Sequence, residues 1–364
     1  MPRAPISMNV HGPWLALGLL AATGAAGQTA QRSFLFNDSH VHLTNYVQEG
    51  TDIRDMLRVM GNKVGRATLF GIPLQQQWSH RVSGEFAPTY YLQTDAPLYY
   101  YSFTDAFIAN AYLSLPREQR ARFDPMITGF NPTDMYAVDH IRRVLTLYPG
   151  VFSGIGEFTI HKEFVSAKVA GEVASLTDPA VDRILDFAGE VGLLVILHND
   201  IDVPFAEREK APVHFEQLKA LFRRHPKTPI IWAHLGVGRV VRPVLHHLVL
   251  VEEILADPEL RHVHMDFSWS EVAKYAVATP ETTRRVAETI TRYPDRFLFG
   301  TDEVAPANQA DYLRVYEQYA PVLELLAPDV REKLLKGNHE RLFDAARVKV
   351  RAWERSQRNR SASP

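Results

Sequence analysis

The stretch Asn37-Asp38-Ser39-His40-Val41-His42-Leu43 follows the apolar run Phe34-Leu35-Phe36 and precedes polar, turn-forming residues. Side chains alternate along a strand with a period of two, so His40 and His42 are predicted on one side of the chain. At the end of a buried strand they would place two imidazoles at one mouth of a fold. Imidazole is a good ligand for zinc and similar divalent metals. The pattern alone is equally consistent with a chance His-x-His on a half-exposed strand, so the remaining chain must decide.

Short apolar runs recur along the chain, and most precede a segment with apolar residues at helical spacing. They lack the polar alternation of a half-exposed strand, so both faces of each strand need cover. After the first run, strands are predicted over residues 64–72, 123–130, 151–158, 193–197, 229–233, 263–267 and 296–300. Helices are predicted over 51–60, 104–115, 135–147, 180–191, 215–224, 244–256, 280–291, 309–326 and 328–354. About eight such units predict an α/β protein, a (β/α)8 barrel with its active site at the C-terminal ends of the strands.

A doubly wound open sheet is the alternative fold. It is disfavoured because no Gly-x-Gly-x-x-Gly follows the first strand. The chain has 364 residues, which suits one barrel with insertions. The barrel domain is predicted over residues 33–347, with an aromatic-rich insertion at 74–122 and a polar C-terminal tail at 348–364, disordered from Ser356.

The N-terminal residues 1–27 have the features of a secretory signal peptide. Arg3 precedes the apolar run Trp14–Ala22, and the small residues Ala25 and Gly27 fit a cleavage site. This predicts a periplasmic or secreted protein, although one basic residue is a weak start and a disordered extension is the alternative. The apolar run is shorter than the ~20 residues that span a bilayer, so no stable membrane anchor is expected.

The composition excludes several kinds of site. The chain has no cysteine, which removes disulfides, thiolate metal ligands and cysteine nucleophiles. Its formal net charge is -2, so nothing in the bulk charge predicts a nucleic-acid partner. Any metal must therefore be held by histidine, aspartate or glutamate.

Six ionisable side chains stand at the ends of predicted strands. In a barrel they would converge on one rim, although they are distant in sequence. Burying them unpaired would cost several kcal/mol, and a shared metal ion removes that cost. The predicted metal ligands are His40, His42, Glu157, His198, His234 and Asp302.

The sequence resembles the amidohydrolase superfamily of metal-dependent TIM-barrel hydrolases, and within it the amidohydrolase-related (amidohydrolase 2) family. The resemblance covers nearly all of residues 37–343. The stretches that carry it are Asp38-Ser39-His40-Val41-His42, Leu197-His198, Ala233-His234, Phe299-Gly300-Thr301-Asp302 and Gly337-Asn338-His339-Glu340-Arg341-Leu342-Phe343.

The resemblance implies a divalent metal, with zinc expected, held by His40, His42, His198 and Asp302. By the same resemblance, His234 would hold a second ion or polarise the substrate. Many one-metal members lack an acid on the fourth strand, whereas the related metal-dependent deoxyribonucleases have a bridging glutamate in a Gly-Glu context. Glu157 follows Gly156, so a second ion stays open.

The chemistry expected of such a site is hydrolysis by activated water. A divalent cation lowers the pKa of bound water toward neutrality, and Asp302 can act as the general base. The residues Arg239, Asp266 and Ser268 are candidates to bind substrate. Candidates to orient the imidazoles are Asp38, His161, Asn199 and Asp200.

The leading hypothesis is a metal-dependent hydrolase that cleaves a C–N or C–O bond (amide, ester or lactone) in a small molecule. The alternatives are a non-oxidative decarboxylase of the same family, a binuclear-metal phosphoesterase, and a metal-binding protein without turnover. A homo-oligomer is left open. The aromatic residues of the insertion either stack on the substrate or pack on one another, and packing is favoured for most of them.

Overall fold

The computed structural model describes residues 34–88, 90–169 and 173–361. The signal peptide predicted at residues 1–27 lies outside the described residues. From Phe34 onward the chain forms one compact unit. Along the described part of the chain, no helix combines the length and the apolar character needed to cross a membrane.

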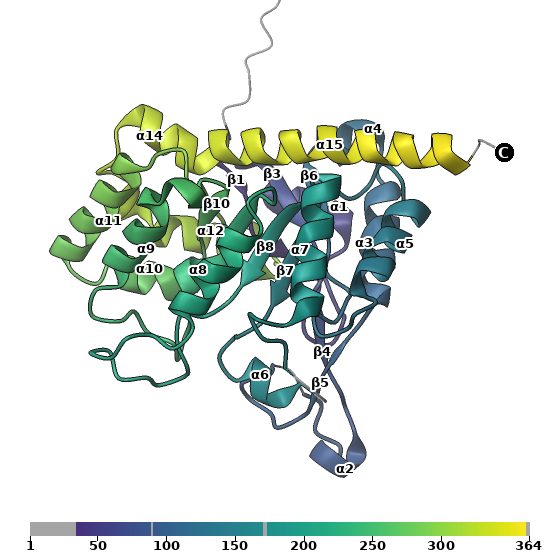
Figure 1. Ribbon diagram of the computed structural model, residues 1–364, viewed down its shortest axis with the longest axis horizontal. Coiled ribbons are helices and arrows are strands. Elements are labelled where there is room, and N and C mark those ends of the chain that lie inside the picture. The colour runs from purple at the N-terminus through teal and green to yellow at the C-terminus, as the bar shows by residue number, and fades with distance from the viewer. Residues whose placement is uncertain (1–33, 89, 170–172, 362–364) are drawn as a thin grey trace, which may run out of the picture. The chain divides into compact units, whose positions relative to one another are not determined.

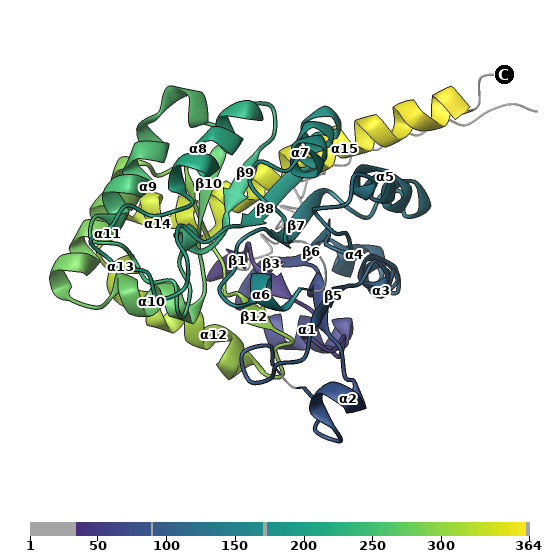
Figure 2. The ribbon, with the colours of Figure 1, turned by 60° about the horizontal axis from the view of Figure 1, so that its bottom comes forward.

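Eight parallel strands form the centre of this unit, and helices surround them (Figure 2). The neighbour order follows the chain without reversal, which confirms the predicted (β/α)8 barrel and excludes a doubly wound sheet. The strands, in order around the barrel, are β1 (Phe36–Asp38), β3 (Val64–Leu69), β6 (Phe123–Ile127), β7 (Gly154–Thr159), β8 (Leu194–His198), β9 (Ile230–Trp232), β10 (Val263–Phe267) and β11 (Phe297–Phe299).

The barrel closes between its first and last strands. The Ser39 backbone N–H donates to the Phe299 carbonyl at 3.0 Å. Beyond this bond, the short strands β2 (Val41–His42) and β12 (Glu303–Val304) pair in parallel and continue the seam toward the C-terminal end. The chain around His42 is therefore held beside the chain that follows Phe299, although more than 250 residues separate them in sequence.

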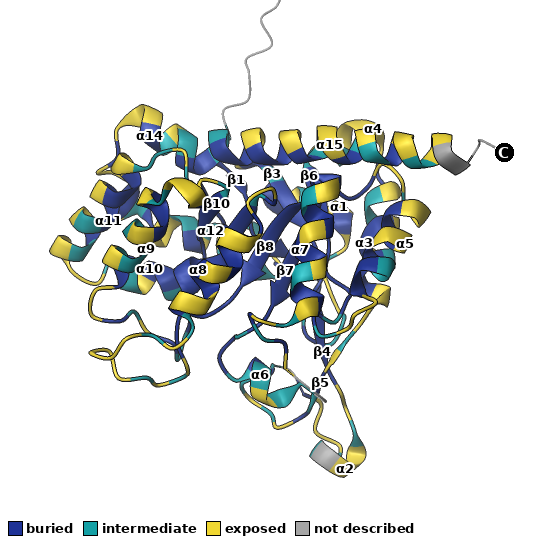
Figure 3. Ribbon diagram, in the orientation of Figure 1, coloured by how far each residue is buried: buried dark blue, intermediate teal, exposed yellow. Residues whose placement is uncertain are grey.

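The helices bury one face against the barrel and leave the other exposed (Figure 3). In α7 (Pro179–Val191), for example, Asp178 caps the first turn by accepting from the Ala180 N–H at 2.9 Å. The other α-helices of the described residues are α1 (Ile53–Met60), α2 (His80–Ser83), α3 (Phe103–Leu113), α4 (Arg117–Arg120), α5 (Ala137–Leu147), α6 (Val165–Lys168), α8 (Phe215–Arg224), α9 (His247–Ala256), α10 (Ser270–Ala276), α11 (Pro280–Arg292), α12 (Gln309–Gln318), α13 (Ala320–Leu323), α14 (Pro328–Glu332) and α15 (Asn338–Ser361).

The long helix α15 crosses the end of the barrel at which the strands begin (Figure 1). The Asn338 amide donates to the Phe297 carbonyl at 2.8 Å, at the first residue of β11. Leu342 and Phe343 are buried in one cluster with barrel side chains such as Leu298. Because this end of the barrel is filled, a substrate can enter only at the opposite end.

The prediction of a disordered C-terminal tail is wrong for the residues that the structure describes. Residues 348–361 are the last part of α15, and Val350 is fully buried. The helix predicted over residues 328–354 is interrupted by a π-helical turn, Lys333–Gly337, between α14 and α15. The tail is polar in composition because only one face of this helix contacts the barrel.

The insertion is an antiparallel pair, β4 (Leu74–Gln76) with β5 (Leu98–Tyr100), carrying the short helix α2 (His80–Ser83). At its base, the rings of Tyr46 and Tyr90 each lie 4.9 Å from that of Tyr91. Tyr91 is fully buried, so these tyrosines pack on one another, which agrees with the interpretation that the sequence favours. Trp78, on the hairpin itself, is 58% exposed.

Candidate metal centre

All six predicted metal ligands lie together at the C-terminal end of the barrel. His40 and His42 follow β1, Glu157 lies on β7 and His198 ends β8. His234 lies in the turn Ala233–Gly236 that follows β9, and Asp302 lies between β11 and β12. The side chain of Asp302 is 8% exposed, and the other five are more deeply buried.

Two of the six have an unusual backbone. The φ angle is 56° at His234 and 54° at Asp302, in the left-handed region that residues other than glycine rarely adopt. Such conformations persist where the surrounding structure enforces them, and they are frequent at functional sites. The turns direct both side chains over the barrel mouth, where His234 Nε2 faces Glu157 and Asp302.

The first group of ligand atoms has the spacing of a metal site. His40 Nε2 and His42 Nε2 lie 3.2 and 3.3 Å from Asp302 Oδ1. Glu157 Oε2 lies 3.4 Å from His42 Nε2 and 3.8 Å from His40 Nε2. Ligand atoms bound to zinc at about 2.1 Å stand about 3.4 Å apart in a tetrahedron. His40 Nε2 is buried and has no hydrogen-bond partner among the described residues, so the donor set fits an ion at this point.

The second group contains Glu157, His198 and His234. His234 Nε2 lies 3.7 Å from both Glu157 Oε1 and Asp302 Oδ2, and within the described chain it also has no hydrogen-bond partner. His198 differs, because Nδ1 bonds directly to Glu157 Oε1 and Nε2 lies 3.1 Å from Asp200 Oδ1. In this arrangement both nitrogens of His198 face carboxylates.

Contacts behind the imidazoles decide which nitrogen points into the centre. His40 Nδ1 lies 2.7 Å from Asp266 Oδ2, and His42 Nδ1 lies 3.1 Å from the Gly71 carbonyl. The Ser268 hydroxyl donates to Asp266 at 2.7 Å, so it accepts from His234 Nδ1 at 2.8 Å. Each Nδ1 therefore carries the proton, and each Nε2 presents a lone pair to the centre.

These contacts correct the prediction that Asp266 and Ser268 bind substrate. Both are fully buried, and their oxygens contact His40, His234 and Ser39. Alternation along β10 turns Asp266 into the barrel, beneath the imidazoles and not at the mouth. Their place in the structure is that of residues that orient the histidines.

Asp38 and His161 also differ from their expected positions. Asp38 accepts from the His40 N–H, from the Thr301 N–H and hydroxyl, and from the Tyr312 hydroxyl. It therefore joins the backbone at His40 to the backbone at Thr301 and contacts no imidazole. The chain leaves the strand conformation after Asp38, which breaks the period-two alternation. His161 stacks on His214 with ring centroids 3.9 Å apart and belongs to neither group of ligand atoms. The Asn199 side-chain amide donates to the Asp200 carbonyl, and no contact with an imidazole is found for it among the described residues.

Lys162 is a part of the centre that the sequence analysis missed. Its ammonium nitrogen lies 3.3 and 3.4 Å from the two carboxylate oxygens of Glu157, and the residue is 8% exposed. Burial opposes its charge, but Glu157 and Asp302 outweigh burial and raise the pKa of Lys162. Burial would raise the pKa of Glu157, yet Lys162 and His198 hold that pKa well below its usual value. The pair is therefore ionised.

Arg239 lies beside the centre and not within it. Its guanidinium stacks 4.8 Å from the ring of Tyr90 and 5.0 Å from that of Trp269, and the Trp269 ring lies 5.0 Å from His234. Arg239 Nη1 has no hydrogen-bond partner in the described residues. A cation in this position can bind an anionic group of a molecule that reaches His234.

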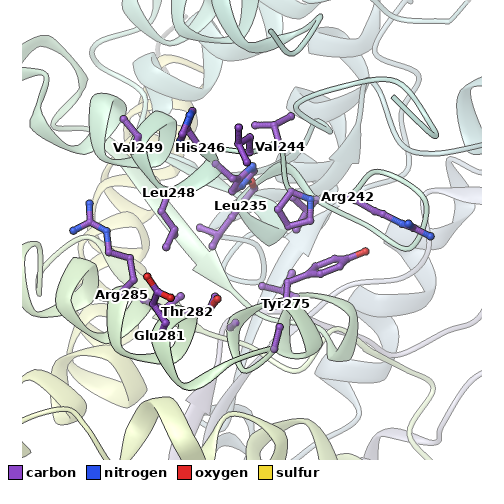
Figure 4. A pocket seen from close by; sticks show the side chains of 18 of the residues that line it. Leu235, Arg242, Val244, His246, Leu248, Val249, Tyr275, Glu281, Thr282 and Arg285 are labelled. Carbon is purple, nitrogen blue, oxygen red and sulfur yellow. The ribbon is translucent and has the colours of Figure 1, made fainter. Parts of the chain in front are cut away.

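A separate cavity of about 780 Å³ opens between α9, α10 and α11 (Figure 4). Its lining is largely apolar, with Leu235 at its centre and Arg242, Tyr275 and Arg285 around it. None of the six predicted ligands lines it, although Leu235 is next to His234 in the chain. The six predicted ligands therefore lie at the barrel mouth and not in this cavity.

Comparison with known proteins also supports the barrel fold. A family model described as amidohydrolase matches residues 38–345. No curated protein matches the sequence. A Pseudomonas putida structure described as a candidate 2-pyrone-4,6-dicarboxylic acid hydrolase is 14% identical with a TM-score of 0.52, over 86% of this chain and 98% of that one.

A Burkholderia multivorans amidohydrolase with bound zinc is also 14% identical, with a TM-score of 0.51, over 85% of this chain and 99% of that one. At these identities the two structures show a shared barrel fold and nothing finer.

Proposed function

The chain belongs to the amidohydrolase family and is a hydrolase, and from this premise we propose that it cleaves an amide, ester or lactone bond in a small molecule. The observation that carries the proposal is the pair of buried nitrogens, His40 Nε2 and His234 Nε2. Both face carboxylates and have no hydrogen-bond partner among the described residues. Lone pairs placed in this way need a cation to offset their burial.

The residues that would hold a divalent ion, with zinc expected, are His40, His42, Asp302 and Glu157, with His234 next to them. When bound, such an ion supplies a Lewis acid and lowers the pKa of water in the site. Asp302 directs Oδ1 toward His40 and His42 and Oδ2 toward His234. Oδ2 is therefore the oxygen we assign to accept the proton of the attacking water and to pass it to the leaving group.

The protonation of His234 limits its role. Because Nδ1 donates to Ser268, Nε2 carries no proton in the neutral ring. Burial lowers the pKa of His234, which keeps the ring neutral. We therefore assign His234 to a lone-pair role, as an ion ligand or a proton acceptor. Neutral Nε2 has no hydrogen with which to polarise a carbonyl.

Arg239 gives the substrate a further property. We propose that it binds an anionic group, and we expect Arg239→Met to raise KM for an anionic substrate about 10- to 100-fold, with a smaller change in kcat. The basis is a charge-assisted hydrogen bond of about 1.5–3 kcal/mol, where about 1.4 kcal/mol is tenfold. Arg242→Met, on an exposed neighbour, is the matched control. Equal KM values in the two variants would remove Arg239 from the substrate site.

The decisive experiment for the function is metal removal and return. Purified protein would be assayed on a panel of lactones, esters and amides before and after dialysis against a chelator. We expect hydrolysis to fall at least ~100-fold without metal and to return with Zn²⁺, because the ion activates the water. Hydrolysis that persists with no metal detected would contradict the proposal.

The same panel separates the alternatives. Release of carbon dioxide from a carboxylated substrate, without uptake of water, would indicate the decarboxylase. Cleavage of phosphate esters in preference to the rest of the panel would indicate the phosphoesterase. Export remains a prediction, because the residues on which it depends lie outside the described part of the chain.

A further inference from the structure

We propose that Lys162 limits the centre to one divalent ion, because its ammonium group occupies the cation position that a second ion would take beside Glu157. The inference rests on the proposed metal-dependent function and answers a question that the resemblance leaves open. A glutamate at this position of the barrel could bridge two ions. Here one side of the Glu157 carboxylate faces His40 and His42, and the other faces Lys162 and His198.

The contact between Lys162 and Glu157 is firmly held. Both Glu157 oxygens lie within 3.4 Å of the ammonium nitrogen, and both residues are buried. The Lys162 backbone is held as well, since its N–H donates to the Ser166 hydroxyl at 3.3 Å and its carbonyl accepts from the Val165 N–H at 2.8 Å. The backbone and the ammonium group of Lys162 are therefore both held, and burial favours the ammonium group beside Glu157.

His198 lies at the second position together with Lys162. Its Nδ1 bonds directly to Glu157 Oε1, so a second ion would have to replace this hydrogen bond, and the charge of the Lys162 ammonium opposes that replacement. Two atoms that share a tetrahedrally bound ion at about 2.1 Å stand about 3.4 Å apart. The first position already has that spacing between Glu157, His42 and Asp302. The geometry therefore provides one position ready for an ion and one that is filled.

The charges around the centre also favour a single divalent ion. Four buried carboxylates contact the imidazoles of the centre: Glu157, Asp302 and Asp266 beside His40 and His42, and Asp200 beside His198. One divalent ion together with the Lys162 ammonium offsets all but one of these charges. A second divalent ion next to that ammonium would place excess positive charge in a buried site, where like charges strongly disfavour one another. Without the ammonium, Glu157 would be left under-compensated and would attract a second cation.

The test is the metal content of the purified full chain after saturation with Zn²⁺ and removal of free ions. We expect one zinc per chain in the unmodified protein and two in Lys162→Met, which keeps the volume but not the charge. Lys162→Arg keeps the charge and should stay at one. Lys219→Met is the matched control, because Lys219 is also buried and paired with glutamates, but lies on α8.

The measured number of ions per chain tests this inference and the proposed function separately. Two ions in the unmodified protein, or one in a folded Lys162→Met, would overturn this inference and leave the proposed hydrolase intact. No ion in the unmodified protein would instead overturn the proposed function. If Lys162→Met does not fold by circular dichroism, Lys162→Gln takes its place. The electron paramagnetic resonance spectrum of the Mn²⁺-loaded unmodified protein checks the count independently: uncoupled ions support it and spin-coupled pairs refute it.

Discussion

Asp302→Asn is expected to lower kcat by about 10²- to 10⁴-fold, the usual contribution of a general base. Asparagine keeps the shape of the side chain, but its amide cannot accept a proton at the position of Oδ2. In the native protein Oδ1 faces His40 and His42 and Oδ2 faces His234, and a cation held by these imidazoles would favour the ionised carboxylate, which can take a proton.

Asp302 also faces the two histidines through Oδ1, so its replacement will weaken ion binding. Steady-state kinetics should therefore be measured at saturating Zn²⁺, with the bound metal quantified in the same sample. Asp295→Asn is the control, since Asp295 is exposed and its carboxylate pairs with Lys333 on the surface. A kcat for Asp302→Asn within threefold of the unmodified protein, with metal bound, would exclude Asp302 as the base.

Asp124→Ala is expected to destabilise the protein by about 3–5 kcal/mol, as breaking a buried ion pair usually does. Asp124 is fully buried at the closed end of the barrel. It accepts from Arg66 at 2.8 and 3.0 Å, from His339 at 3.0 Å and from Arg347 at 2.5 Å. Burial alone would raise the pKa of Asp124, but His339 and Arg66 outweigh it and hold the pKa below its usual range. Alanine would leave Arg66 largely buried without its main partner.

The free energy of unfolding from urea titrations tests this expectation. Asp344→Ala is the control, because Asp344 pairs with the same arginine at 2.8 Å but is 55% exposed. An exposed pair contributes about 0–1 kcal/mol. A loss below about 1 kcal/mol for Asp124→Ala would show that this cluster does not anchor α15 beneath the barrel.

The fold could be predicted from sequence because its signals are local. The apolar spacing places a helix at Phe215–Arg224 and a strand at Val263–Phe267, and both have these bounds in the structure. The prediction was less accurate where a segment leaves the barrel, as at β3, which ends at Leu69 and not at Ile72. There the chain turns into the insertion, and apolar composition continues although strand pairing stops.

The sequence by itself determined the barrel and the six residues that meet at its mouth. This was possible because parallel strands of a barrel all end at one rim, so polar residues such as His198 and Asp302 that end apolar strands must converge. Only the tertiary structure decided what surrounds them. In the structure Lys162 contacts Glu157, and Asp266 contacts the His40 imidazole. Asp38 contacts backbone groups and does not orient an imidazole. Such contacts join residues with no shared periodicity, and they depend on where each turn directs a side chain.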